Sequence, residues 1–205
     1  MVNLGILISG RGSNMEAILA AIKSGKIKNV KPCVVISNKP DAAGLKIASD
    51  KYNVPIEVIP SNGLRGWDYD YKVVTALHEH DVMPQSGLVC LAGFMRIISP
   101  EFVSEYKMRI LNIHPALLPS FPGLHAQKQA LEYGVRVTGC TVHFVDDGID
   151  SGPVILQKPV QVMEGDNEET LSARILEQEH QLYPEAVRLF GEGKISVKGR
   201  RVSIT

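Results

Sequence analysis

VNLGILISGRGSN, residues Val2 to Asn14, is an apolar run followed by a glycine-rich loop. The run ends at glycine and is typical of a buried parallel strand. Apolar residues then recur at the spacing of a helix, at positions 15, 18, 19 and 22. A strand, a glycine loop and a helix start together predict an anion site, because glycine lets the backbone approach a ligand and the first N–H groups of a helix point towards it. The alternative is a plain turn in which Ser13 caps the helix.

Strands and helices continue to alternate as far as about residue 113. Further apolar runs predict strands at Pro32–Ser37, Ile56–Ile59, Gly87–Ala92 and Met108–Ile113. The helices expected between them are Ala42–Tyr52, Trp67–His80 and Ser99–Tyr106. Ser99 is the expected N-cap of the last of these, with Pro100 in its first turn. This alternation predicts an α/β fold with a doubly wound, mostly parallel sheet.

The rest of the chain predicts an antiparallel C-terminal extension of that sheet. Two alternating runs, Thr138–Val145 and Val154–Val162, are separated by a loop short enough for a hairpin. Helices are expected before and after them, at 126–133 and from about residue 171 to 190. Residues 191–205 are expected to form a small terminal hairpin, to which no function is assigned. We therefore expect one domain, 1–205, with segments 1–113, 114–190 and 191–205.

The segment Leu111–His125 carries polar residues with a clear chemical meaning. Asn112 and His114 stand two positions apart at the end of an expected strand, where residues i and i+2 point to the same side. They place an amide donor beside a group that exchanges a proton near neutral pH. Three prolines follow within the segment and predict a rigid loop, since each has a fixed φ and no N–H. A purely structural histidine is the alternative.

The composition narrows the classes of partner. Lys plus Arg and Asp plus Glu are balanced at 22 each, which gives no electrostatic case for a nucleic-acid or membrane partner. The three cysteines are widely spaced in apolar runs, as in buried reduced thiols. No leader or membrane-length apolar run is found, so a cytoplasmic location is expected. The spacing of His78 and His80 does not favour a metal site on one helix face, and no metal is expected.

Three motifs together resemble the folate-dependent formyltransferases. They are Leu91–Ile97 (LAGFMRI), Leu111–His125 (LNIHPALLPSFPGLH) and Gly148–Pro153 (GIDSGP). The resemblance covers nearly the whole chain, to about Phe190, and implies a Rossmann-like fold with 10-formyltetrahydrofolate as co-substrate. Within the family, the chain looks most like the members that formylate the amine of 5-phosphoribosylglycinamide in purine synthesis. Residues 114–190 would then be the folate-binding and catalytic half, and residues 1–113 the phosphate-binding half.

The resemblance also implies roles for particular residues. Gly12, Ser13 and Asn14 would hold the ribose phosphate, and Glu179 would contact the glycinamide, although a solvated charge is the alternative for Glu179. Main-chain groups of the segment Met95–Ile98 would bind the folate pterin, with ordinary core packing of its apolar side chains as the other interpretation. The full set expected at the folate site is Arg65, Met95, Arg96, Ile97, Ile98, Asn112, Asp146, Asp147, Gly148, Ile149 and Asp150.

Asn112, His114 and Asp150 are the catalytic residues that the resemblance implies. Asn112 would donate to the oxyanion of a tetrahedral intermediate, with protonated His114 as a second donor. Asp150 is expected to orient the ring of His114 and to raise its pKa above the usual value of about 6.5. Turn chemistry is the alternative for Asp150, because it stands in an Asp-Ser-Gly sequence.

Three other activities compete with this prediction. A formyltetrahydrofolate hydrolase is expected to carry an additional N-terminal regulatory domain before the strand that begins at Val2, and a methionyl-tRNA formyltransferase is expected to carry a further C-terminal domain and a basic surface. A non-catalytic folate-binding protein would not need Asn112, His114 and Asp150 together. Small-molecule substrates and a monomer or homodimer are expected, with the oligomeric state left open.

Overall fold

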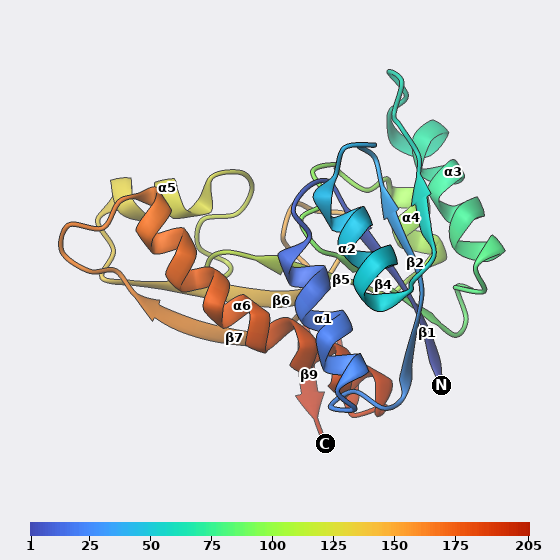
Figure 1. Ribbon diagram of the computed structural model, residues 1–205. Coiled ribbons are helices and arrows are strands. Elements are labelled where there is room, and N and C mark those ends of the chain that lie inside the picture. The colour runs from blue at the N-terminus through green and yellow to red at the C-terminus, as the bar shows by residue number, and fades with distance from the viewer.

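The computed structural model describes all residues, 1–205, and its centre is a seven-stranded sheet (Figure 1). The strand order is β3-β2-β1-β4-β5-β6-β7. Its strands are β1 (Val2–Ile8), β2 (Val30–Ser37), β3 (Ile56–Val58), β4 (Gly87–Leu91), β5 (Ile110–His114), β6 (Val137–Phe144) and β7 (Val154–Gln161). Neighbouring strands are parallel from β3 through β5, whereas β6 is antiparallel to both β5 and β7. The predicted doubly wound sheet with an antiparallel extension is confirmed.

Helices cover both faces of the sheet (Figure 1). They are α1 (Ser13–Lys23), α2 (Ala43–Tyr52), α3 (Gly66–Glu79), α4 (Pro100–Glu105), α5 (Ala126–Tyr133) and α6 (Glu168–Gly191). Side chains of β1 alternate between two buried clusters, since successive residues of a strand point to opposite faces. Leu4, Ile6 and Ile8 pack with α1, α2 and α6, and Leu7 packs with α3 and α4. The nearly continuous apolar composition of β1 follows from this burial on both faces.

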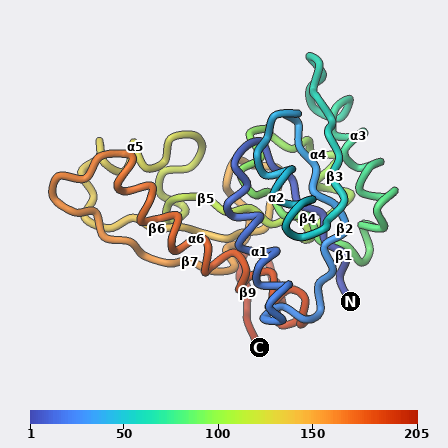
Figure 2. The backbone as a smooth tube through the Cα atoms, viewed as in Figure 1, coloured from blue at the N-terminus to red at the C-terminus, as the bar shows by residue number.

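The antiparallel extension projects to one side of the parallel part (Figure 2). Strands β6 and β7 continue the sheet there, α5 covers their outer end, and α6 runs back along them to α1. Asn112 of β5 pairs with His143 of β6. The extension therefore brings residues of β6 and of the β6–β7 loop beside the end of β5.

The expected element boundaries differ from the structure by a few residues. The fifth strand was expected at Met108–Ile113, but Met108 has a left-handed φ of 57° and the strand runs from Ile110 to His114. His114 is thus held within the sheet. Ser99 caps α4 as expected, with its hydroxyl accepting from the N–H of Phe102.

The terminal segment folds as a separate two-stranded hairpin, β8 (Ile195–Lys198) with β9 (Arg201–Ile204), as expected. None of the helices combines the length and the apolar character needed to span a lipid bilayer.

Candidate active site

Asp150 is the centre of a cluster of polar side chains at the end of β5. Its Oδ2 lies 3.2 Å from His114 Nδ1 and accepts from the N–H of Gly123 at 2.8 Å. Its Oδ1 lies 3.4 Å from Asn112 Nδ2. The structure therefore brings Asn112, His114 and Asp150 together, although residues 111–114 and 150 belong to different parts of the chain.

The loop around Asp150 reaches this position because its glycines allow a tight return. A Cβ on Gly152 would lie 1.8 Å from the carbonyl oxygen of Phe144, and one on Gly148 would lie 2.1 Å from Ser151 Oγ. Asp146 Oδ1 accepts from Ser151 Oγ at 2.6 Å within the same loop. Asp150 itself has a left-handed φ of 49°. Aspartate tolerates this conformation better than most residues, which explains part of the turn chemistry seen in the sequence.

Both ring nitrogens of His114 face acceptors. Nε2 lies 2.8 Å from the carbonyl oxygen of Phe121, which belongs to the proline-rich loop, and Nδ1 faces Asp150. A neutral ring can donate to only one of them, whereas an imidazolium donates to both. The rigid loop predicted from its prolines thus orients the ring.

The pKa of His114 is nevertheless lowered, so the expectation of a value above 6.5 was wrong. Burial is the largest cause, because it disfavours the charged ring, and the Asp150 carboxylate and the Phe121 carbonyl oppose it. The effects on the pKa of Asp150 are also opposed. Burial raises that pKa, but the nearby His143 ring, the hydrogen bond from the Gly123 N–H and the charge of His114 outweigh it and lower the pKa below its ordinary value.

His143 is a fourth member of the cluster that the sequence analysis did not identify. Its Nε2 lies 3.3 Å from Asn112 Nδ2 and 3.6 Å from Asp150 Oδ1, and its Nδ1 lies 2.8 Å from the Phe144 carbonyl oxygen. Only 2% of the residue is exposed. The available signal was a histidine in a strand without other charged side chains, but its pairing with Asn112 depends on the strand register.

The glycine loop connects β1 to α1. Gly12 has a left-handed φ of 73° and is the N-cap of α1, with no side-chain cap, so the alternative with Ser13 as N-cap was wrong. Asn14 Nδ2 donates to Glu179 Oε2 at 2.7 Å. Glu179 is only 7% exposed, so its interpretation as a solvated charge was wrong as well.

The Asn14–Glu179 pair has unused hydrogen-bonding capacity. Asn14 Oδ1 is buried without a partner. Burial raises the pKa of Glu179, and the hydrogen bond from Asn14 opposes that rise. Two acceptors therefore lie together where a donor from a ligand would relieve the cost of their burial.

The segment expected to bind folate follows β4. Met95 and Ile97 are 67% and 80% exposed, so their side chains are not core residues. Arg96 packs over the ring of Tyr69 and donates to the Leu64 carbonyl oxygen at 3.0 Å, while its Nε is buried without a partner. Ile98 is half-buried against the α3 side of the sheet.

Other predicted folate-site residues lie on exposed loops. Arg65 precedes α3, and its side chain has no hydrogen bond or ion pair. Asp147, Gly148 and Ile149 are exposed in the β6–β7 loop that ends at Asp150.

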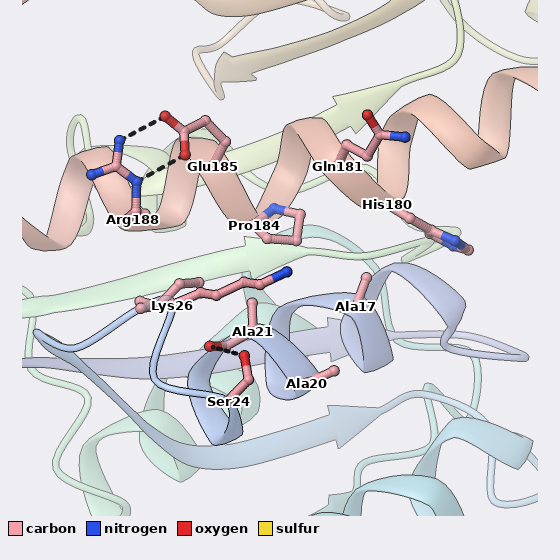
Figure 3. Close-up of a pocket in the computed structure, with 11 residues that line it drawn as sticks. Ala17, Ala20, Ala21, Ser24, Lys26, His180, Gln181, Pro184, Glu185 and Arg188 are labelled. Carbon is pink, nitrogen blue, oxygen red and sulfur yellow. Dashed lines mark hydrogen bonds and ion pairs between the residues drawn. The ribbon is translucent and has the colours of Figure 1, made fainter.

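A cavity of about 590 Å³ lies apart from these groups, between α1 and α6 (Figure 3). It is lined by small side chains of α1, including Ala17 and Ala21, and by His180 and Pro184 of α6. None of the residues expected to bind substrate lines it. No group of three or more His, Cys, Asp or Glu side chains is arranged to hold a metal ion.

Comparisons with known proteins identify the family of the chain. Residues 2–187 match the family described as formyl transferase. Phosphoribosylglycinamide formyltransferase of Escherichia coli K12 is 46% identical over 196 residues, which are 96% of this chain and 90% of that protein. The trifunctional purine biosynthetic protein adenosine-3 of Drosophila pseudoobscura pseudoobscura is 45% identical over 98% of this chain and 14% of its own length. The crystal structure of glycinamide ribonucleotide transformylase 1 from Symbiobacterium toebii superposes with a TM-score of 0.93 at 47% identity, over all of this chain and 94% of that one. The chain therefore belongs to the formyl transferase family.

Proposed function

We propose that this protein transfers the formyl group of 10-formyltetrahydrofolate to the primary amine of 5-phosphoribosylglycinamide, a step of purine biosynthesis. The observation that carries the proposal is the cluster of Asn112, His114 and Asp150, combined with the buried Asn14–Glu179 pair next to the glycine loop. The relatives named for this activity support it, because they match almost the full length of the chain.

The residues present fit both substrates. The first turn of α1 offers free N–H groups for a phosphate, and Gly12 leaves room for its approach. Asn14 Oδ1 and Glu179 are acceptors for N–H groups of the glycinamide. The exposed side chains of Met95, Ile97 and Ile149 offer apolar surface for a flat folate ring.

The chemistry requires a nitrogen–carbon bond to form and another to break. Attack of the amine on the formyl carbon leaves negative charge on the formyl oxygen, to which Asn112 donates a hydrogen bond, and the positive charge of a protonated His114 ring stabilises it. Asp150 keeps the ring oriented and favours its charged form against the effect of burial. The amine loses a proton and the folate nitrogen gains one, and the Asp150 carboxylate is the group expected to pass the proton between them through solvent.

The decisive experiment records tetrahydrofolate formation with and without 5-phosphoribosylglycinamide. We expect turnover only when the phosphorylated amine is present, with one formylated product per folate released. Turnover without the amine would indicate a hydrolase instead. Binding of folate without any turnover would indicate a non-catalytic folate-binding protein.

The proposal extends to the cellular location and the oligomeric state of the protein. We infer a cytoplasmic enzyme that acts on small molecules without a nucleic-acid partner, as a monomer or a homodimer. Balanced charge supports this inference. Sedimentation of the purified protein over a range of concentrations distinguishes the two assembly states.

A further inference from the structure

Ser9 connects the glycine loop to the segment after β4 that is expected to bind folate. It follows β1 and is only 5% exposed. Its N–H donates to the Gly93 carbonyl oxygen at 3.0 Å, and its Oγ accepts from the Met95 N–H at 2.8 Å. The turn that follows β4 is therefore held by one residue at two points.

The hydroxyl of Ser9 has a defined orientation. Oγ donates its hydrogen to Asn38 Oδ1 at 2.6 Å, which leaves its lone pairs for the N–H of Met95. Asn38 follows β2, so the chain of hydrogen bonds joins the ends of β2, β1 and β4. These strands are adjacent in the sheet, and their C-terminal ends are where ligands of open α/β sheets bind.

The hydrogen bond between Ser9 and Met95 joins two segments that are expected to bind different substrates. Gly10–Asn14 continues directly from Ser9 towards the phosphate, and Met95–Ile98 continues from the second hydrogen bond towards the folate. Direct transfer requires the amine and the formyl carbon to meet at about 3–3.5 Å, and a misplacement of about 1 Å can reduce the rate roughly a hundredfold.

We propose that Ser9 is a positioning residue that couples the phosphate-binding loop to the folate-binding segment, so that each substrate strengthens the binding of the other. The inference rests on the proposed function for the identity of the two substrates. It adds that ordering either loop orders the other, through the hydrogen bond between Ser9 Oγ and the N–H of Met95.

Ser37 provides a matched control for Ser9. It is a fully buried serine at the corresponding end of neighbouring β2, and its Oγ bonds only to the main chain of Lys39, within its own turn. Loss of either hydroxyl removes buried hydrogen bonds and lowers stability. Only loss of the Ser9 hydroxyl removes a hydrogen bond between the glycine loop and the segment after β4.

The test is calorimetric titration of 5-phosphoribosylglycinamide into the protein with and without saturating tetrahydrofolate, a pair that cannot react. We expect the parent and Ser37→Ala to bind the amine at least about fivefold more tightly with tetrahydrofolate present, which is the lower end of typical coupling between sites. Ser9→Ala should show less than a twofold difference (about 0.4 kcal/mol), and its kcat should fall more than its KM for either substrate rises.

The possible outcomes separate this inference from the proposed function. A parent that binds neither ligand contradicts the proposed function. A parent that binds both ligands without coupling, or a Ser9→Ala protein that keeps the parent's coupling, overturns the role of Ser9 alone. If Ser9→Ala does not fold, Asn38→Ala replaces it, because losing the acceptor frees the hydroxyl to rotate. That variant should lose at least half of the coupling free energy, and full retention overturns the inference.

Discussion

The glycine loop after β1 and the loop that carries Asp150 are built in opposite ways. The glycine loop presents main-chain groups of consecutive residues, and its shape depends on Gly12 at a left-handed φ of 73°. The Asp150 loop presents one side chain, which contacts groups from β5, from β6 and from the loop at Gly123. Binding of a phosphate can therefore rest on backbone geometry, whereas the chemistry depends on a few side-chain atoms that meet through the tertiary fold.

This difference predicts where single substitutions should act most strongly. Removing one charge from the side-chain cluster should affect kcat, because it changes groups that act on the reacting atoms. Adding one methyl group to the glycine loop should affect binding, because it displaces the main-chain N–H groups expected to hold the phosphate.

The largest effect on kcat is expected for Asp150→Asn, which removes the carboxylate charge at nearly constant side-chain volume. The carboxylate raises the pKa of His114 against burial, so its loss should lower that pKa further and reduce the imidazolium population at neutral pH. We expect kcat to fall by about a thousandfold or more, as for other carboxylates that orient a catalytic imidazole.

NMR titration of the His114 ring, together with steady-state kinetics, checks this prediction. Asp41→Asn, at an exposed aspartate before α2, is the charge-matched control and should leave both quantities unchanged. An unchanged pKa of His114 with preserved kcat would falsify the pairing and leave Asp150 as a turn residue.

The second-largest effect, also a loss of kcat, is expected for Asn112→Ala. Loss of one oxyanion donor typically reduces kcat by about a hundredfold to a thousandfold. Affinity for both substrates should stay near the parent value, because the interaction strengthens only as charge develops. Stopped-flow kinetics at saturating substrates measures the chemical step, and a kcat within a few-fold of the parent would exclude Asn112 as the donor.

The third prediction concerns the glycine loop, where Gly12→Ala should weaken binding of the phosphorylated amine. A Cβ there would lie 2.9 Å from Gly44 Cα, so the glycine loop would have to shift to accept it. KM for the phosphorylated amine should rise roughly tenfold, the effect of losing about one hydrogen bond to a charged group, while KM for the folate changes little.

Gly25→Ala is the matched control for backbone strain. Gly25 has a similar φ of 77° and no atom near its potential Cβ. Gly25→Ala should lose about 1–2 kcal/mol of stability in urea unfolding, because an L-residue is strained at this φ, and Gly12→Ala should lose more, because its Cβ also meets the backbone of Gly44. Equal loss of affinity for both substrates in Gly12→Ala would argue against the phosphate site.

The smallest effect is a gain in the free energy of unfolding, which is expected for Glu179→Gln. Burial raises the pKa of Glu179 above its ordinary 4.5, so the folded state holds the proton more tightly and the parent loses stability as pH rises through this range. Glutamine keeps the acceptor for Asn14 without the charge. The variant should be about 1 kcal/mol more stable at pH 7, as is common when a functional charge is removed, while it binds the amine substrate more weakly.

Thermal unfolding at a series of pH values measures this difference. The advantage of the variant should shrink to nothing below about pH 4.5, where the carboxyl is protonated in both folded and unfolded states. A variant less stable than the parent at pH 7 would show that the buried charge has a partner other than Asn14.

Much of the fold was predictable because it depends on local patterns. Apolar runs bounded by glycine predict β1 and β4, and Ser99-Pro100 predicts the start of α4, since strand burial and helix capping act over a few residues. The boundary of β5 was predicted less well. Met108 is apolar, but its left-handed φ excludes it from the strand, and hydrophobicity carries no information on φ.

The candidate site divides in the same way. The sequence alone determined the glycine loop, the Asn112–His114 spacing and the proline-rich loop, because neighbours in the chain are neighbours in space. Only the tertiary structure decided that His143 lies beside Asn112, that Ser9 Oγ accepts from the N–H of Met95, and that burial lowers the pKa of His114 despite Asp150. Strand register, the closing of loops and the exclusion of water are properties of the packed chain, and each depends on residues far apart in the sequence.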